Sequence, residues 1–167
     1  MEMKQPFERV VTQHGEAVLR VCRAVLGPHT DADDAWSETF LAAMQAYPEL
    51  DERANIRAWL VTIAHRKAID VIRTRQRHIT AGDEIPEPTV TAAAGEDGAQ
   101  DLWNAVKRLP DKQRKVLAYR YLAGLSYREV AEVLGGTPEA ARRAAADGIE
   151  HLRREYRPDP DPIGATQ

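Results

Sequence analysis

The sequence of 167 residues predicts an all-α protein made of two small helical domains that an acidic, flexible linker joins. Two observations predict this fold class: apolar residues recur with the 3.6-residue period of helices, and no segment alternates with the two-residue period of strands. A third observation divides the chain, because residues 78–101 are rich in Pro, Gly and Thr and carry six acids without any Lys or Arg. We therefore expect domains at 1–77 and 102–157, and a disordered tail at 158–167.

The first domain is expected to contain three helices. One stripe of apolar residues spans 7–25 at helical spacing and stops before Gly27, which together with the following proline is a strong helix end. A second stripe spans 36–47 and stops at Pro48. A third amphipathic pattern predicts a helix over 56–77.

The second domain carries clearer signals of helix ends. Short helices are expected over 102–109, before a proline, and over 111–122. Ser126 and Glu129 occupy the N-cap and N3 positions of a capping box, so a third helix should begin there and end at a Gly-Gly pair. A last helix is expected over 138–154.

The last two helices have the pattern of a helix-turn-helix: a capped helix of about eight residues, a glycine turn and a longer helix that Thr137 can cap. In DNA-binding proteins of this pattern the second helix enters the major groove with its N-terminal residues nearest the bases. An ordinary helical hairpin with solvated charges is the alternative. The candidate DNA contacts in this motif are Arg128, Thr137, Glu139, Arg142 and Arg143.

The charges are strongly segregated, although 23 basic and 26 acidic side chains leave a net charge of only −3. Residues 28–50 contain five acids and no Lys or Arg, a composition that suits a basic protein partner and repels DNA. Residues 51–77 contain seven basic and three acidic side chains. A basic block attracts polyanions locally, because screening acts over about 8–10 Å. The third helix is therefore a candidate nucleic-acid contact.

Several classes of function are not expected. The single cysteine, Cys22, excludes an internal disulfide or a multi-cysteine metal site, and its place on an apolar stripe predicts a buried side chain. The five histidines are scattered without ligand spacing, and no phosphate-binding loop, HExxH or nucleophile elbow occurs. The sequence has neither an apolar run long enough for a membrane span nor a signal-peptide core. We expect a cytoplasmic, non-enzymatic protein without metal or cofactor.

Motifs in both domains together resemble one protein family. Residues 32–40, which read ADDAWSETF, and residues 56–73, which begin IRAWLVTIA, are similar to sigma region two. Residues 125–135, which read LSYREVAEVLG, are similar to sigma region four. In this order, with an acidic linker between them, the motifs resemble those of the extracytoplasmic-function (ECF) sigma factors, the small two-domain sigma subunits of bacterial RNA polymerase. The resemblance covers about residues 7–154.

The resemblance implies that the chain binds core polymerase, recognises a promoter and helps to open it. The first domain would bind the clamp helices of the large polymerase subunit through Asp33, Asp34, Glu38 and Phe40. It would also read and open the minus-ten element, with a flipped base held in the turn at 47–55. The contacts to this element would come from Asn55, Arg57, Trp59, Arg66, Lys67, Asp70, Arg73, Arg75 and Arg77. The helix-turn-helix would bind the minus-thirty-five element, and an anti-sigma factor is a common partner in the family.

Some residues leave alternatives open. Phe40 and Trp59 fall on apolar stripes, so both could instead be core residues. Arg66 stands where the family usually has Asn, and Ala144 and Asp147 stand where the recognition helix usually has arginines. Binding of the minus-thirty-five element is therefore expected to be weaker or altered in preference. The alternative functions are a helix-turn-helix regulator that acts without polymerase, and a decoy that no longer binds DNA.

Overall fold

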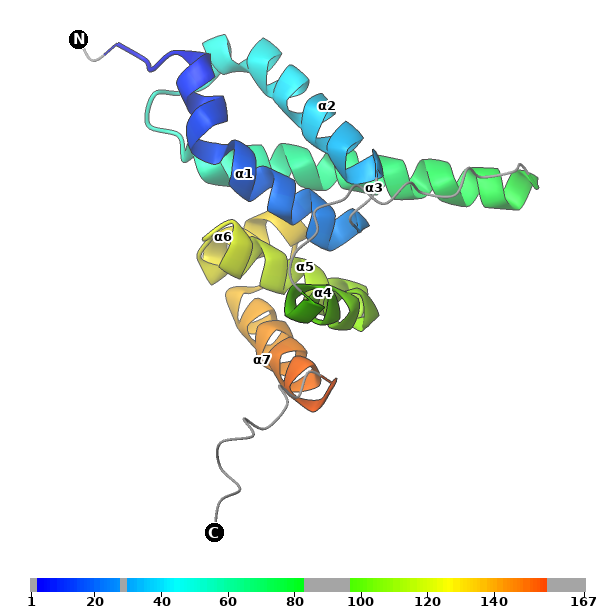
Figure 1. Cartoon of the computed structure of the whole chain (residues 1–167). Coiled ribbons are helices and arrows are strands. Elements are labelled where there is room, and N and C mark those ends of the chain that lie inside the picture. Colours follow the sequence, from blue (N-terminus) through cyan, green and yellow to red (C-terminus); the bar gives the residue numbers. More distant parts are fainter. Residues whose placement is uncertain (1–2, 28–29, 83–96, 156–167) are drawn as a thin grey trace.

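The computed structural model describes residues 3–27, 30–82 and 97–155, and within these ranges it contains helices and no strand, which confirms the all-α class (Figure 1). In chain order the elements are α1 (Phe7–Leu26), α2 (Thr30–Ala46), the 3-10 helix η1 (Tyr47–Glu49), α3 (Ile56–Ala81), α4 (Asp97–Arg108), α5 (Asp111–Leu117), the π-helical turn η2 (Ala118–Leu122), α6 (Tyr127–Leu134) and α7 (Pro138–Glu155). The predicted tail lies outside the described residues.

Helices α1, α2 and α3 form a first unit around a core to which all three contribute. Val10 of α1, Phe40 of α2 and Leu60 of α3 are at most 6% exposed. The indole of Trp36 crosses from α2 to α1, where its Nε1–H donates to the carbonyl oxygen of Gly15 at 2.9 Å. The apolar stripes read from the sequence mostly form the inward faces of these helices, as their helical spacing predicts. Met44 is the exception in the stripe at 36–47, because its side chain is 51% exposed.

The boundary between the units differs from the one expected from composition. Helix α3 continues to Ala81, four residues beyond the predicted end, and closes at Gly82, whose φ of 75° is a left-handed conformation that favours glycine. Helix α4 begins at Asp97, before the predicted start at 102. Both ends of the predicted linker are thus helical, and its remaining residues, 83–96, lie outside the described residues.

Helices α4 to α7 form the second unit, in which the predicted capping signals are present. The Ser126 hydroxyl oxygen accepts from the Glu129 N–H at 3.1 Å, and the Glu129 carboxylate accepts from the Ser126 N–H at 2.9 Å. The capping box of α6 is therefore confirmed. The Thr137 hydroxyl oxygen likewise accepts from the Ala140 N–H at 3.1 Å and caps α7.

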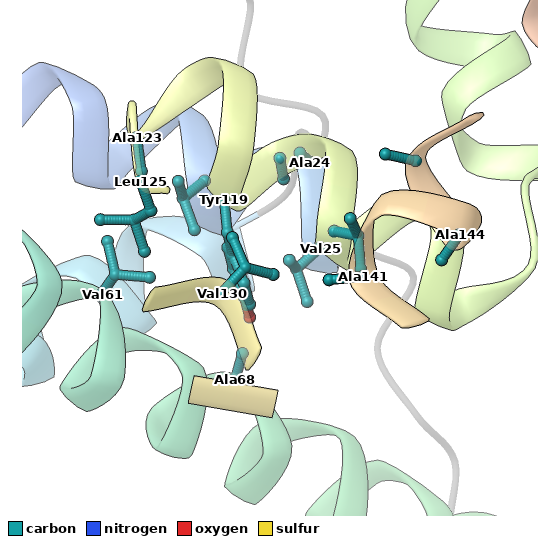
Figure 2. Close-up of a cluster of buried hydrophobic side chains, with 14 residues drawn as sticks. Ala24, Val25, Val61, Ala68, Tyr119, Ala123, Leu125, Val130, Ala141 and Ala144 are labelled. Carbon is teal, nitrogen blue, oxygen red and sulfur yellow. The ribbon is translucent and has the colours of Figure 1, made fainter. Parts of the chain in front are cut away.

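One continuous core joins the two units (Figure 2). Tyr119 and Leu125 of the second unit lie in the same cluster as Val21 and Val25 of α1 and Val61 of α3, and each of the five is at most 5% exposed. Tyr119 belongs to the π turn η2, where the predicted single helix over 111–122 widens. The second unit therefore packs on the surface of α1 and α3.

Helix α7 contains a glycine that close helix packing requires. A Cβ atom at Gly148 would lie 2.8 Å from Leu117 Cδ1 and 3.3 Å from Gln113 Cβ, so α5 and α7 approach closely at this point. Alanine normally stabilises a helix interior by roughly 1 kcal/mol relative to glycine. Here we expect Gly148→Ala to lower the free energy of unfolding by about 1–3 kcal/mol, because overpacking outweighs that gain.

Urea unfolding of the full chain measures this effect, and Ala146→Gly is the matched control on an exposed position of the same helix. The control should lower the stability by about 1 kcal/mol through helix propensity alone. A stabilised Gly148→Ala variant would contradict the close contact between α5 and α7.

Candidate polymerase and promoter interfaces

The predicted polymerase-binding residues do not all lie on the surface. Asp34 and Glu38 of α2 are exposed and Asp33 is half-buried. Phe40 is only 6% exposed, because its ring packs against Trp36 with a centroid distance of 4.8 Å. The assignment of Phe40 as a partner contact is therefore corrected to a core position.

The exposed apolar residues of α2 were missed by the sequence reasoning. Leu41 is 57% exposed and Met44 is 51% exposed, which is unusual for large apolar side chains. Asp34, Glu38 and Leu41 follow the i, i+4, i+7 spacing and so share one face of the helix. The sequence signal was available, because Leu41 lies off the stripe that Phe40 and the other core residues define.

The turn before α3 is fixed by its own polar contacts. The Oδ1 atom of Asn55 accepts from the Ala58 N–H at 3.1 Å and caps α3. The Asn55 amide donates to the carboxylate of Glu129, the capping residue of α6 in the other unit. Asn55 was predicted as a base contact, and in this structure its side chain joins the two units at the start of α3.

The short η1 turn is held from the N-terminal segment, which the sequence reasoning did not assign to any site. The ammonium of Lys4 donates to the carbonyl oxygens of Tyr47 and Leu50, each at 2.5 Å. The Tyr47 hydroxyl donates to the Gln5 carbonyl oxygen at 2.6 Å. These contacts fix the backbone of the turn in which a flipped base was expected.

The expected minus-ten residues of α3 differ in their exposure to solvent. Arg66, Asp70, Arg73 and Arg77 are exposed, and Lys67 is half-buried. The C-terminal part of α3 extends beyond the other helices in Figure 1. The exposed arginines can therefore reach phosphates without any rearrangement of the helix.

Two other predicted minus-ten contacts have partners within the first unit. The guanidinium of Arg75 forms an ion pair with Asp31 of α2. Trp59 is half-buried against the first core, with its ring centroid 6.4 Å from that of Tyr47. This position favours the interpretation of Trp59 as a core residue, which was one of the two alternatives for it.

A partly buried hydrogen bond links α3 to the second unit. His65 Nδ1 and the Tyr119 hydroxyl oxygen are 2.6 Å apart, and Tyr119 is fully buried. Burial lowers the pKa of His65, and the nearby Lys115 and Arg66 cations lower it further against the opposing effect of Asp111. Burial also raises the pKa of Tyr119 well above its ordinary value. Both groups are therefore neutral near pH 7.

These shifts predict an acid sensitivity. Burial also lowers the pKa of His14, so both His14 and His65 bind protons less readily in the folded chain than in the unfolded chain. Stability is then fully present above the ordinary histidine pKa of 6.5 and is lost as the pH falls below it. We expect a lower urea midpoint at pH 5.5 than at pH 7.5, with a smaller difference in His65→Gln.

The helix-turn-helix presents its predicted contacts to solvent. Thr137, Glu139, Arg142 and Arg143 are exposed at the start of α7, and Arg128 is exposed on α6, where it pairs with Glu132 at 3.8 Å. The Arg142 guanidinium lies 5.5 Å from the centroid of the Tyr127 ring, a cation–π distance.

The two residues of the recognition helix that depart from the family pattern lie in different surroundings. Ala144 is 7% exposed and belongs to the shared core, so a small side chain is required there. Asp147 is exposed one turn after Arg143 and lies beside Glu150. These two carboxylates place negative charge in the middle of α7, between the arginines of its first turns and those of its last turn.

The cysteine is buried, and the described residues form no metal site. Cys22 is 1% exposed, as expected, and burial raises the pKa of its thiol to about 12, with a further contribution from the Asp33 carboxylate. Across residues 3–27, 30–82 and 97–155 no group of His, Cys, Asp and Glu side chains is arranged to hold a metal ion. None of the helices in those ranges combines the length and apolar character needed to span a membrane.

These features define a two-unit helical protein that carries one acidic exposed face, on α2, and two faces with exposed arginines, on α3 and α7. Family models assign both units, with Sigma-70 region 2 matching residues 10–78 and Sigma-70 region 4 matching residues 99–152. The chain is 33% identical over 140 residues to the ECF RNA polymerase sigma factor SigC of Mycobacterium tuberculosis, a match that covers 81% of this chain and 76% of that protein. It is 28% identical over 151 residues to the RNA polymerase sigma factor NccH of Alcaligenes xylosoxydans xylosoxydans, over 84% of this chain and 81% of that protein.

Solved structures agree with this family. The sigma factor RpoE of Bartonella quintana, in complex with the anti-sigma factor NepR, has the same fold with a TM-score of 0.81 at 21% identity, over 92% of this chain and 98% of that one. CnrH, in complex with the cytosolic domain of CnrY, matches with a TM-score of 0.62 at 25% identity, over 89% and 85% of the two chains.

The chain belongs to the sigma-70 family and is an ECF sigma factor, a subunit that directs RNA polymerase in transcription initiation. Because both sigma regions are matched, the alternatives of a polymerase-independent regulator and of a decoy are not favoured.

Proposed function

We propose that this sigma factor binds core polymerase through the exposed face of α2. The observation that carries the proposal is the combination of the Asp34 and Glu38 carboxylates with the exposed side chains of Leu41 and Met44. Adjacent large apolar side chains on a surface are typical of protein interfaces, and carboxylates repel DNA. The partner surface should therefore be basic at its rim and apolar at its centre.

We further propose that the two basic faces divide the promoter between them. The exposed arginines of α3 would bind phosphates of the minus-ten element, and the turn at 47–55 would hold a base that leaves the melted strand. The start of α7 would bind the minus-thirty-five element through Thr137, Glu139, Arg142 and Arg143. These contacts support promoter opening in the bacterial cytoplasm, while the polymerase carries out the RNA synthesis.

An anti-sigma factor is a proposed partner. The solved relatives RpoE and CnrH are complexes with NepR and with the cytosolic domain of CnrY. We infer that a protein of this kind binds the present chain, because it has the same two-unit helical fold. Co-purification of the tagged chain with its cellular partners tests this inference directly.

Polymerase binding is tested by Asp34→Ala and Leu41→Ala. Each is expected to weaken the binding of core polymerase by about tenfold, roughly 1.4 kcal/mol, because each removes part of the proposed contact. Glu16→Ala on α1 is the matched control, since Glu16 is a carboxylate that is 88% exposed on another helix. Fluorescence titration of labelled chain with core polymerase measures the affinities. Variants that changed only the DNA affinity of the free chain would contradict the assignment of α2.

A further inference from the structure

The side chain of Tyr127, the first residue of α6, contacts two arginines from other elements. Its ring centroid is 4.8 Å from the guanidinium carbon of Arg120 in η2 and 5.5 Å from that of Arg142 in α7. Both distances are typical of cation–π interactions, in which the negative face of the ring attracts the cation. The ring therefore joins the first helix of the helix-turn-helix to a candidate DNA contact on the second.

The ring of Tyr127 is itself held in place. The capping box of α6 directly precedes it, and the ring packs against the core that contains Val130. Its hydroxyl group is hydrogen-bonded to Tyr121, which is the main reason that the pKa of Tyr121 is raised. Arg120 is fixed as well, because its Nη1 atom donates to the carbonyl oxygen of Leu125 at 2.9 Å. The ring is thus a fixed surface against which an exposed side chain can be oriented.

An aromatic partner differs from an acidic partner in what it leaves free on an arginine. The guanidinium of Arg154, for example, donates to the Glu150 carboxylate at 2.8 Å, which uses part of its donor capacity. A ring contacts the face of a guanidinium plane instead, so the N–H groups at the edge of the plane stay available. Such donors can form paired hydrogen bonds to O6 and N7 of a guanine. The contact of Arg142 with Tyr127 is therefore compatible with base recognition.

We propose that Tyr127 is a positioning residue, which holds the guanidinium of Arg142 in the direction that reads a base pair of the minus-thirty-five element. The inference rests on the proposed function, because it requires the start of α7 to bind this element. A free arginine side chain loses conformational entropy when it binds a base, and a side chain that is already restricted loses less. The benefit concerns discrimination among bases, because attraction to phosphates does not depend on sequence.

Base discrimination by holoenzyme measures this role. Run-off transcription with core polymerase first maps a promoter, and duplexes with each base pair of its minus-thirty-five element replaced in turn then compete for binding. We expect Arg142→Ala to reduce the preference for the original base pair at one position by about tenfold. Tyr127→Leu should reduce the preference at the same position by about threefold or more. Tyr127→Phe keeps the ring and should change it by less than about twofold.

Two further measurements separate positioning from a structural role. Tyr127→Leu combined with Arg142→Ala should lose no more discrimination than Arg142→Ala alone, because the ring acts only through that arginine. Val133→Ala is the matched structural control, since Val133 packs against the same core from the same helix. This control should lower the urea midpoint of the chain and leave the preference for every base pair unchanged.

Three results would overturn the proposal while a loss of discrimination in Arg142→Ala left the proposed function intact. Full discrimination in Tyr127→Leu would show that the arginine needs no ring. Equal losses in Tyr127→Leu and Tyr127→Phe would assign the effect to the hydroxyl group, and a similar loss in Val133→Ala would assign it to the stability of α6. An unchanged preference in Arg142→Ala would remove this arginine from the proposed minus-thirty-five interface and overturn the inference with it.

Discussion

Tyr119→Ala is expected to lower the free energy of unfolding of the full chain by about 3–5 kcal/mol, the range for truncation of a buried aromatic side chain. Tyr119 is fully buried at the junction of the two units, and its hydroxyl meets His65 at 2.6 Å. Truncation therefore removes apolar contacts and leaves a cavity in the core that α1, α3 and η2 share.

Equilibrium unfolding in urea at pH 7.5 measures this loss, and two variants divide it into its parts. Tyr119→Phe keeps the ring and should lower the stability by only about 1 kcal/mol through the lost hydrogen bond. Tyr121→Ala, two residues away and 59% exposed, should change the stability by less than about 1 kcal/mol. Equal losses in Tyr119→Ala and Tyr121→Ala would contradict the shared core.

The double variant Arg73→Ala, Arg77→Ala is expected to reduce the salt dependence of promoter binding by holoenzyme. Both guanidinium groups are exposed on the projecting end of α3. Each phosphate contact contributes about 0.9 to the slope of log affinity against log salt, so the slope should fall by about two. When the salt concentration rises from 50 to 200 mM, the affinity of both holoenzymes falls. The factor by which it falls should be about ten times smaller for the variant than for the unmodified holoenzyme.

Arg9→Ala, Arg20→Ala is the matched control, because it removes two exposed arginines from α1. Filter-binding or fluorescence titrations at several salt concentrations provide the slopes. An unchanged slope in the α3 variant would remove this helix from the promoter interface, whereas a similar decrease in the control would point to net charge alone.

The helices and their caps could be predicted because their signals are local. The capping box is formed by Ser126 and Glu129, which are only three positions apart. The cap of α7 requires only Thr137, which directly precedes a proline. The same reasoning was available for Asn55, which is a preferred N-cap residue directly before the predicted start of a helix.

The joining of the two units could not be predicted in the same way. It depends on the contact of Tyr119 and Leu125 with Val61 in one core. Both residues are more than fifty positions away from Val61 along the chain. The sequence holds one indirect sign of this contact. Val61 and Ala68 are apolar on a side of α3 that does not face the first core, so α3 has two buried faces. A surface helix with a second apolar side requires a second partner, but periodicity does not say which one.

The position of Phe40 shows how a motif and a helical face can disagree. The resemblance implied that Phe40 shares a polymerase-binding face with Asp34 and Glu38. Phe40 lies four residues after Trp36, one turn further along the same side of α2, and the two rings pack together. The neighbouring Leu41 projects to solvent instead, so a partner of this helix would meet leucine rather than phenylalanine.

The state of Cys22 has a consequence for how the chain receives signals. It is the sole cysteine of the sequence, and inside the first core its thiol stays protonated at physiological pH. Oxidants and electrophiles react with exposed thiolates, and the folded chain offers them none. A redox stimulus is therefore not expected to act on this subunit through Cys22 while the chain is folded.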